Sequence, residues 1–344
     1  MRLLVVRLTS LGDVVHAVPA VAALRRAFPA AQIDWLVGDR CRELVELVPV
    51  IDRCLATPRF PAAFPRLLRT LRAARYDAAI DFQGLLKSAV LARGSGAGRV
   101  IGFGRGQVRE RAARLFYTET PDIGSPAHVI DRNFALGAAL GAPRGPAEFP
   151  IASPRSAAVE RARAALGRPE SREFALLNPG AAWPSKCWPA ERFGALARGL
   201  WREHGLPSVV AWGPGERALA DRVVAASDAA AAAAPPTRIA DLVALSRAAA
   251  VMVAGDTGPL HVAAAVGTPV VGIYGPTDPR RNGPWSAADA VVSPSGGCRC
   301  WQDRPASAGV IVRRCTRAES CMAAIPVEEV AAAVSRRIGS VSDA

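Results

Sequence analysis

Short apolar runs rich in valine, isoleucine and leucine recur along the chain, and a polar turn and an amphipathic stretch follow most of them. Runs of this length and composition predict buried strands. The strands expected in this way are residues 3–8, 33–37, 51–55, 76–81, 99–103, 174–178, 208–212, 249–253 and 269–274. Strands that alternate with helices build parallel sheets covered by those helices. The sequence therefore predicts an α/β fold.

The segments between these strands predict helices. They are expected at 14–28, 42–48, 64–75, 110–117, 129–140, 157–166, 190–204, 216–226, 241–248 and 259–266, with another opening at 82–88 and a closing helix at 327–338. Pro19 lies inside the first of them and should kink that helix or delay its regular part. The alanine run 229–234 is interpreted as a frayed helix end.

Chain length and one proline- and glycine-rich segment divide the chain. A single hydrophobic core rarely serves more than ~250–300 residues, and this chain has 344, half of them hydrophobic. Segment 141–154 has the composition of an interdomain linker. We predict Rossmann-like domains at 1–150 and 151–325, and a C-terminal helix and tail at 326–344. Parallel sheets bind ligands where strands end in loops, so two such edges would face each other across a cleft.

The charge of the chain indicates an anionic partner. The formal net charge is +13, which fits nucleic acid, an anionic membrane surface or phosphorylated substrates. Nucleic acid is not expected, because no basic stretch is interleaved with aromatic residues and no familiar nucleic-acid-binding module occurs. We find no signal peptide and no apolar stretch of ~20 residues. Together with an odd number of cysteines, seven, this predicts a cytoplasmic protein.

Segment 254–267 follows an expected strand and opens a helix. Asp256 or Thr257 is placed to cap that helix. The unpaired N–H groups at a helix start carry the positive end of the helix dipole, and they form a site for phosphate or carboxylate. Gly258 and His261 add close backbone access and an imidazole. For this segment alone, an ordinary connection between strand and helix is the alternative.

Segment 9–13 ends the first strand and includes Ser10, Gly12 and Asp13. A carboxylate at this edge can act as a general base, and the alternative is that Asp13 only caps the next helix. Because Gly12 stands alone, the segment is not a glycine-rich dinucleotide fingerprint.

Two strand ends in the second half carry polar groups suited to a phosphate or to hydroxyl groups of a ligand. Gly180 lets a ligand approach the backbone, and Lys186 can deliver a point charge to a phosphate. Lysine is strongly under-used relative to arginine, which makes an ordinary solvated role for Lys186 less attractive. Glu216 begins a helix, where it either complements the helix dipole or accepts hydrogen bonds from a ribose or sugar hydroxyl.

Cations follow the later strand ends of the first half. Lys87, Arg109 and Arg132 are placed to meet a partner with carboxylates or phosphates. The alternative for each is a solvated position on a helix face.

Four cysteines lie within 24 positions near the C-terminus: Cys298, Cys300, Cys315 and Cys321. Thiols in such a group can hold a structural zinc ion or an iron–sulfur cluster. Their spacing differs from the common paired Cys-x₂-Cys, and two disulfides are disfavoured in a reducing compartment. We therefore predict no metal and no cofactor.

Several segments, taken together, resemble glycosyltransferase family 9, the bacterial lipopolysaccharide heptosyltransferases. They occur in order up to about residue 285, at 7–16, 81–88, 178–180, 186–189, 255–261 and 275–284. Segments 109–117 and 128–132 are similar to the heptosyltransferase I branch, which adds the first heptose to Kdo₂-lipid A.

The resemblance implies a GT-B fold, a donor, ADP-L-glycero-D-manno-heptose, bound by the second half, and a Kdo-lipid A acceptor bound by the first. It implies that Asp13 is the base and that Lys186 stabilises the leaving diphosphate. The implied donor-binding residues are Ser10, Gly12, Gly180, Glu216, Asp256, Thr257, Gly258 and His261. The implied acceptor-binding residues are Lys87, Arg109 and Arg132. The positive charge would hold such an enzyme on the cytoplasmic face of the inner membrane.

The chain also departs from the family pattern. Loop 181–185 lacks the threonines that relatives usually place before the lysine, and the cysteine-rich stretch 298–321 is not typical of the best-known heptosyltransferase I enzymes. The alternatives are another family 9 transferase such as heptosyltransferase II, a GT-B nucleotide-sugar epimerase or hydrolase, and a non-catalytic nucleotide-sugar binding protein.

Overall fold

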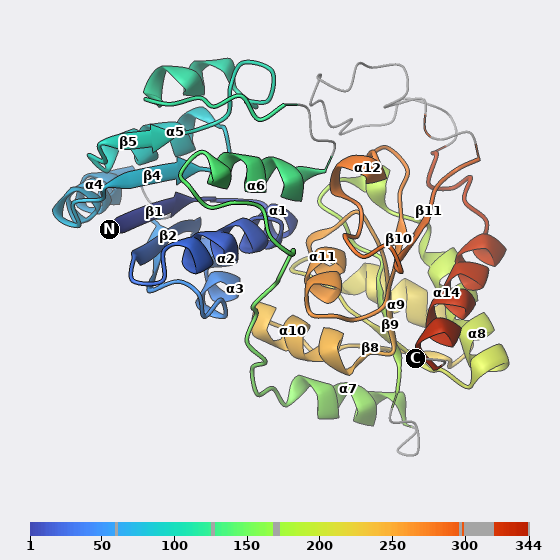
Figure 1. The fold of residues 1–344 in the computed structure, drawn as a ribbon. Coiled ribbons are helices and arrows are strands. Elements are labelled where there is room, and N and C mark those ends of the chain that lie inside the picture. The colour runs from blue at the N-terminus through green and yellow to red at the C-terminus, as the bar shows by residue number, and fades with distance from the viewer. Residues whose placement is uncertain (59–60, 125–127, 168–172, 296–297, 299–319, 343–344) are drawn as a thin grey trace. The chain divides into compact units, whose positions relative to one another are not determined.

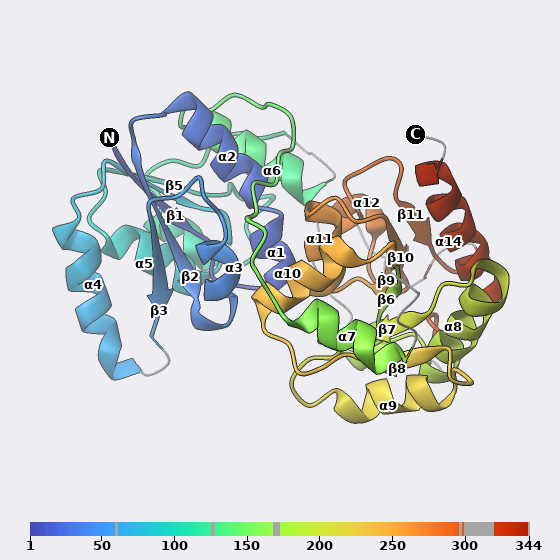
Figure 2. The ribbon, with the colours of Figure 1, turned by 90° about the horizontal axis from the view of Figure 1, so that it is seen from below.

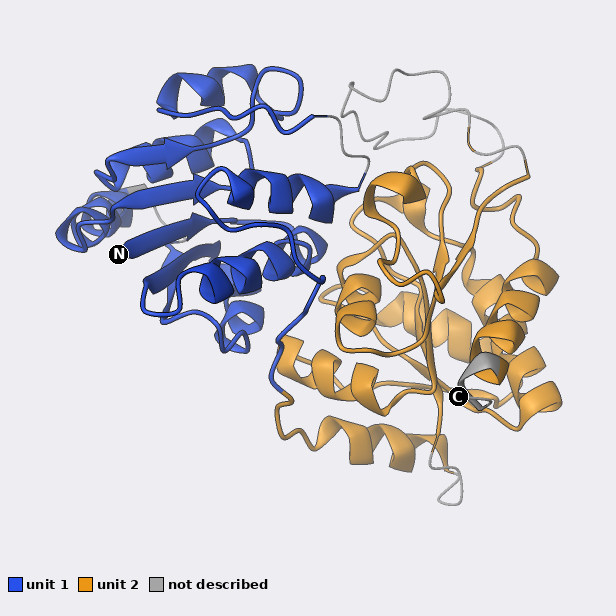
Figure 3. Cartoon of the chain, viewed as in Figure 1, with its two compact units in different colours: residues 1–152 blue, residues 153–344 orange. Residues whose placement is uncertain are grey.

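The chain forms two compact units, Met1–Ala152 and Ser153–Ala344 (Figure 3). They are seen in a computed structural model that describes residues 1–58, 61–124, 128–167, 173–295, 298 and 320–342. The division between the units falls inside the proline- and glycine-rich segment 141–154.

The first unit has a five-stranded parallel sheet in the order β3-β2-β1-β4-β5 (Figure 1). The strands are β1 (Arg2–Val6), β2 (Gln32–Gly38), β3 (Arg53–Thr57), β4 (Ala78–Asp81) and β5 (Arg99–Ile101). The chain runs outward from β1 to β3 and then returns to the other side of β1 as β4. Val6 lies opposite Asp81, so the loops that leave β1 and β4 start side by side. A crevice at such a switch in strand order is where α/β sheets bind ligands.

The helices of the first unit are α1 (Leu11–Val15), α2 (Val18–Ala27), α3 (Arg42–Glu46), α4 (Phe64–Ala73), α5 (Leu86–Gly94) and α6 (Val129–Ala138), with 3-10 turns η1 (Asp39–Cys41), η2 (Pro61–Ala63) and η3 (Arg111–Phe116). The helix expected at 14–28 is two helices, because Pro19 lies in the first turn of α2, where its missing N–H costs nothing. The helix expected at 110–117 is the tighter 3-10 form.

The second unit repeats this topology with one more strand, in the order β11-β10-β9-β6-β7-β8 (Figure 2). The strands are β6 (Ala175–Asn178), β7 (Ser208–Val210), β8 (Ala231–Ala233), β9 (Val251–Gly255), β10 (Val270–Ile273) and β11 (Ala290–Val292). The chain again runs outward from its first strand and returns beside it, here as β9. Asn178 lies opposite Ala254, so the loops after β6 and β9 also start together.

Helices cover both faces of the second sheet, and this explains why its strands are apolar throughout. They are α7 (Ala158–Leu166), α8 (Ala190–His204), α9 (Arg217–Ala225), α10 (Ile239–Ala248), α11 (Gly258–Ala265), α12 (Pro279–Asn282) and α14 (Val327–Ser342), with the 3-10 turn η4 (Pro184–Lys186). Neighbouring residues of one strand enter opposite cores. Leu177 packs with Phe193 of α8, whereas Leu176 packs with Leu260 of α11.

The alanine run 229–234 was expected to be a frayed helix end, and that prediction is wrong. Ala231–Ala233 forms β8, the edge strand, and pairs with Ser208–Val210 in parallel. Asp228 and Ala229, between the end of α9 and this strand, adopt positive φ angles of 53° and 58°. Alanine favours helices in isolation, but pairing with β7 and burial against the sheet outweigh that weak preference.

None of the helices within the described ranges combines the length and apolar character needed to cross a membrane.

Candidate active site

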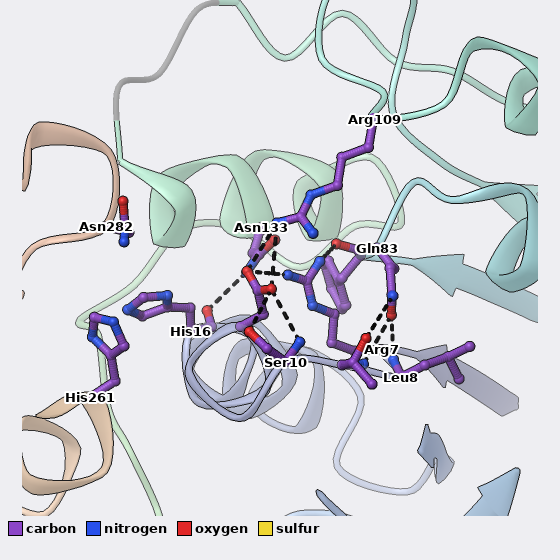
Figure 4. A network of polar contacts seen from close by, with 12 residues as sticks. Arg7, Leu8, Ser10, His16, Gln83, Arg109, Asn133, His261 and Asn282 are labelled. Carbon is purple, nitrogen blue, oxygen red and sulfur yellow. Dashed lines mark hydrogen bonds and ion pairs between the residues drawn. The ribbon is translucent and has the colours of Figure 1, made fainter. Parts of the chain in front are cut away.

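Asp13 lies on α1, directly after β1, at the switch point of the first unit. Arg7 Nη2 lies 2.5 Å from Asp13 Oδ1, and Arg109 Nη2 lies 3.2 Å from the same oxygen. Ser10 donates to Oδ2 from its backbone N–H at 3.2 Å and from its hydroxyl at 3.0 Å (Figure 4). The Asp13 side chain is 18% exposed. The carboxylate therefore helps to cap α1 and still presents a surface to a ligand.

Arg7 is a charged residue at the end of a buried strand. Its side chain is 2% exposed, and it donates to the backbone carbonyl of Phe82, which follows β4, as well as contacting Asp13. A buried guanidinium loses its hydration, so removing either partner would be costly. The sequence prediction gave Arg7 no role. The signal was its position at the end of an apolar run, where a cation needs a buried acid.

The pKa of Asp13 reflects two opposing effects. Burial alone would raise it, but the positive charges of Arg7 and Arg109 outweigh burial and hold the Asp13 pKa well below its ordinary value. The carboxylate is therefore ionised at neutral pH. It can accept a hydrogen bond from a hydroxyl, and its role as a base stays a prediction.

Gln83 and Asp81 brace the loops around Asp13. Gln83 Oε1 accepts from the backbone N–H of Leu8 at 2.6 Å and of Thr9 at 3.2 Å (Figure 4). Asp81 is fully buried and accepts from the Gln83 N–H at 2.8 Å and from the Tyr117 hydroxyl at 2.7 Å. Burial raises the pKa of Asp81. The polar end of β4 thus holds the loop after β1 in place.

The three cations expected to bind an acceptor have different surroundings. Arg109 contacts Asp13, as described above. Lys87 Nζ instead lies 5.2 Å from the centre of the Phe64 ring, an arrangement that attracts a cation to the ring face. Arg132 is on α6, and the next residue, Asn133, donates to the backbone carbonyl of His16 at 2.9 Å. Acceptor binding stays a prediction for all three.

Asp256 is the centre of a second polar cluster, at the switch point of the second unit. Lys186 Nζ lies 2.5 Å from Asp256 Oδ2. His261 Nε2 lies 3.2 Å from Oδ1, and the Asn282 amide donates to Oδ1 at 2.6 Å. The Asp256 and Lys186 side chains are only 6% and 11% exposed. The sequence prediction missed Asn282, although it lies in a segment that resembles the family.

Burial alone would raise the Asp256 pKa, but the His261 hydrogen bond and the Lys186 charge outweigh it and lower that pKa. Of the two residues predicted to cap α11, Thr257 takes the cap position, but its side chain makes no cap hydrogen bond. Both Asp256 oxygens already have partners.

The start of α11 therefore keeps N–H groups for a ligand. The Thr257 hydroxyl oxygen is also buried without a hydrogen-bond partner within the described part of the chain. Together with Gly258 as the first helical residue, these groups can hold an anion, as helix N-termini commonly do.

Two glycines in the second unit allow close contacts that a larger side chain would block. A Cβ on Gly255 would lie 2.8 Å from the Lys186 carbonyl oxygen, so this glycine lets η4 approach β9. A Cβ on Gly180 would lie 2.3 Å from the Glu216 carboxylate. Glu216 Oε2 accepts from the Gly213 N–H at 2.8 Å, while Oε1 has no partner among the residues that the structure describes. Glu216 thus keeps one oxygen to accept from a ligand hydroxyl.

Ser10 and Gly12, which were expected on the donor side, lie in the first unit. Ser10 holds Asp13, and Gly12 is buried within α1. Contact with a donor stays a prediction for both.

The cysteine group is only partly described. Cys298 is buried and Cys321 is partly exposed, whereas Cys300 and Cys315 lie outside the described residues. Within the described ranges, no three side chains of the metal-binding types gather. A four-cysteine site is thus not tested.

Each unit therefore has a polar site at its switch point. The first presents an ionised, partly exposed carboxylate beside arginines. The second presents a fixed lysine, a helix N-terminus and a free hydroxyl, all suited to a phosphate that gains negative charge.

Comparison with known proteins identifies the family. The family model described as glycosyltransferase family 9 (heptosyltransferase) matches residues 64–309. Lipopolysaccharide heptosyltransferase 1 of Pseudomonas aeruginosa is 31% identical over 313 residues, covering 87% of this chain and 85% of the relative. The structure of E. coli heptosyltransferase WaaC with ADP matches with a TM-score of 0.76 at 25% identity, covering 98% of this chain and all of that one.

The structure of E. coli ADP-heptose lps heptosyltransferase II has a TM-score of 0.78 at 20% identity, covering 99% of this chain and 100% of that one, which supports the fold. Because the family model spans well over half of the chain, the protein belongs to glycosyltransferase family 9, the heptosyltransferases.

Proposed function

We propose that this protein is an inverting heptosyltransferase that moves heptose from ADP-L-glycero-D-manno-heptose to a Kdo residue of the lipopolysaccharide inner core. The observation that carries the proposal is the pair of switch-point sites, one built on Asp13 and one on Lys186 and Asp256. Relatives named lipopolysaccharide heptosyltransferase 1, at 29–31% identity over most of the chain, support this substrate pair.

The second unit would bind the donor. Lys186 donates to the carboxylate and to the backbone carbonyl of Asp256, and the third ammonium proton would bind the diphosphate. The N–H groups at Gly258 and the Thr257 hydroxyl would hold the same group. Glu216 Oε1 would accept a hydrogen bond from a ribose or sugar hydroxyl.

The first unit would supply the base. The acceptor oxygen attacks the anomeric carbon on the face opposite the diphosphate, and the bond between that carbon and the phosphate oxygen breaks. Asp13 takes the proton of the attacking hydroxyl, while the leaving ADP gains a charge next to Lys186 and the start of α11. A positioned base typically accelerates such a step by ~10²–10⁴.

Arg109 would connect acceptor binding to the strength of the base. It contacts Asp13 and is one third exposed, so it can also bind a carboxylate or phosphate of the acceptor. An acceptor anion at Arg109 would offset part of the charge that lowers the Asp13 pKa. Asp13 would thus become a stronger base when the acceptor is bound. Lys87 and Arg132 would add contacts to a large anionic acceptor.

The acceptor is a membrane lipid, so the enzyme would work at the cytoplasmic face of the inner membrane. The net charge of +13 supports attraction to anionic lipids there.

One experiment tests the proposal directly. The purified protein is incubated with ADP-heptose and Kdo₂-lipid A, and the lipid is analysed by mass spectrometry. We expect the mass of one added heptose. Consumption of ADP-heptose without acceptor would indicate a hydrolase or epimerase, and transfer only to an already heptosylated core would indicate another family 9 acceptor. Either result contradicts the proposal.

A further inference from the structure

We propose that one face of the first unit, formed by α5 and η3, docks the protein onto an anionic lipid bilayer. We call it the α5–η3 patch and define it as Leu86, Val90, Arg93, Arg111, Arg114 and Leu115.

Both elements of this patch carry exposed aliphatic side chains. Five large hydrophobic side chains are exposed in the described part of the chain, and three of them are Leu86 at 41%, Val90 at 39% and Leu115 at 85%. Leu86 and Val90 are four residues apart on α5 and so lie on one face of that helix. The 3-10 helix η3, which carries Leu115, packs against α5. Single exposed leucines are ordinary, but a cluster on two adjoining elements is typical of an interaction surface.

The charge around these side chains is strongly positive. Residues 84–116 include seven lysines and arginines and one acidic residue, Glu110. Glu110 is already engaged, because its carboxylate accepts from the Leu86 N–H at 2.6 Å. Arg93, Arg111 and Arg114 are exposed, and none of them has an acidic partner among the described residues. The cations of the patch are therefore free to meet an anionic partner.

An anionic bilayer fits both features at once. Aliphatic side chains enter the boundary between headgroups and acyl chains, while arginines contact lipid phosphates. A water-soluble phosphate ligand would leave Leu86, Val90 and Leu115 without a function.

The patch adjoins the Asp13 site within the same unit. The Glu110 N–H donates to the Gly84 carbonyl at 3.0 Å, and Arg109, the residue before Glu110, contacts Asp13. The link between the patch and the acceptor rests on the proposed function. An acceptor whose sugar lies at Asp13 would keep its lipid anchor in the bilayer on which the patch is docked.

Vesicle binding tests the patch. The full-length protein is floated with phosphatidylcholine vesicles that contain or lack phosphatidylglycerol, over a range of salt concentrations. We expect binding only to the anionic vesicles, and weaker binding at higher salt. Leu115→Glu should weaken it at least about tenfold, because a charge replaces a leucine that would enter the bilayer. Arg111→Ser with Arg114→Ser should weaken it roughly 10- to 30-fold.

Matched controls come from exposed residues outside the patch. Val291, 42% exposed on β11, gives Val291→Glu as the control for Leu115→Glu. Arg42→Ser with Arg202→Ser changes the net charge by the same amount as the double patch variant, at side chains that are 55% and 71% exposed. The inference is overturned if controls and patch variants weaken binding equally. It is also overturned if Leu115→Glu leaves vesicle binding intact but dissociates a dimer in light scattering.

The test separates the patch from the proposed function. Patch variants should retain transfer to an acceptor stripped of its acyl chains and lose transfer to the same acceptor in vesicles. If no sugar is transferred under any condition but vesicle binding still depends on the patch, the proposed function fails and the docking surface stands.

Discussion

The two units share one topology but use the aspartate at the switch point differently. In the first unit, Asp13 follows the first strand, is 18% exposed and contacts two arginines. In the second, Asp256 follows the fourth strand, is 6% exposed and contacts Lys186, His261 and Asn282. Charged neighbours lower both pKa values. The difference lies in what remains accessible, because Asp13 can still meet a hydroxyl, whereas Asp256 serves to hold a lysine.

The largest expected effect is a loss of activity when the Asp13 carboxylate of the first unit is removed. Asp13→Asn keeps the shape of the side chain and removes its basicity, so kcat should fall ~10²–10⁴-fold. The affinity for ADP, measured by calorimetry, should not change, because Asp13 is not proposed to bind the nucleotide. Near-normal turnover in this variant would falsify the base role.

Removing Lys186 of the second unit should lower kcat by nearly as much. Lys186→Ala deletes a donor to the leaving group, and loss of one such donor typically costs ~10²–10³-fold in kcat. ADP should also bind more weakly. The variant leaves Asp256 buried without its cation, which should lower the free energy of unfolding by ~3–5 kcal/mol.

A double variant separates these two consequences. Lys186→Ala with Asp256→Asn removes the unpaired charge, so urea unfolding should recover much of the lost stability while turnover stays low. If turnover returned together with stability, Lys186 would be structural and the comparison between the units would fail.

A smaller effect is expected for the residue that the sequence prediction missed. Asn282→Ala removes a donor to Asp256 and should lower the free energy of unfolding by ~1–3 kcal/mol. Because Lys186 would be held less firmly, KM for ADP-heptose should rise several-fold. Proton transfer to Asp13 should not change. Asn282→Asp should lower the free energy of unfolding further, since it adds a second negative charge beside Asp256. A change in kcat without any change in KM would contradict this assignment.

The smallest effect is a pH dependence common to both units. The pKa values of Asp13 and Asp256 are lower in the folded protein than in the unfolded chain. Their stabilising contribution is therefore complete above the unfolded pKa of about 4 and is lost as pH falls toward the folded values. Each group can change the free energy of unfolding by up to about 1.4 kcal/mol per pH unit.

Urea unfolding between about pH 2 and pH 6 measures this dependence. Asp13→Asn and Asp256→Asn should each flatten the loss of stability at low pH. Single variants with the same slope as the wild-type protein would mean that these carboxylates are not held by their cations in solution.

Much of the fold followed from local pattern. Strands buried on both faces are apolar throughout, so the runs that became β1, β6 and β9 could be recognised without tertiary information. Local pattern failed where a neighbour decided the conformation. Ala231–Ala233 became a strand because β7 offered hydrogen bonds, and residues 111–116 became a 3-10 helix beside α5.

The sequence by itself determined which residues lie at the strand ends, and thereby placed Asp13, Lys186 and Asp256 as candidate site residues. Only the tertiary structure decided what each of them contacts. Lys186 and Asp256 are 70 residues apart, and Leu8 and Gln83 are 75 apart. Partners at that separation leave no periodic signal in the sequence. They meet because parallel strands bring the ends of distant segments to one edge of a sheet, and that pairing exists only once the sheet has formed.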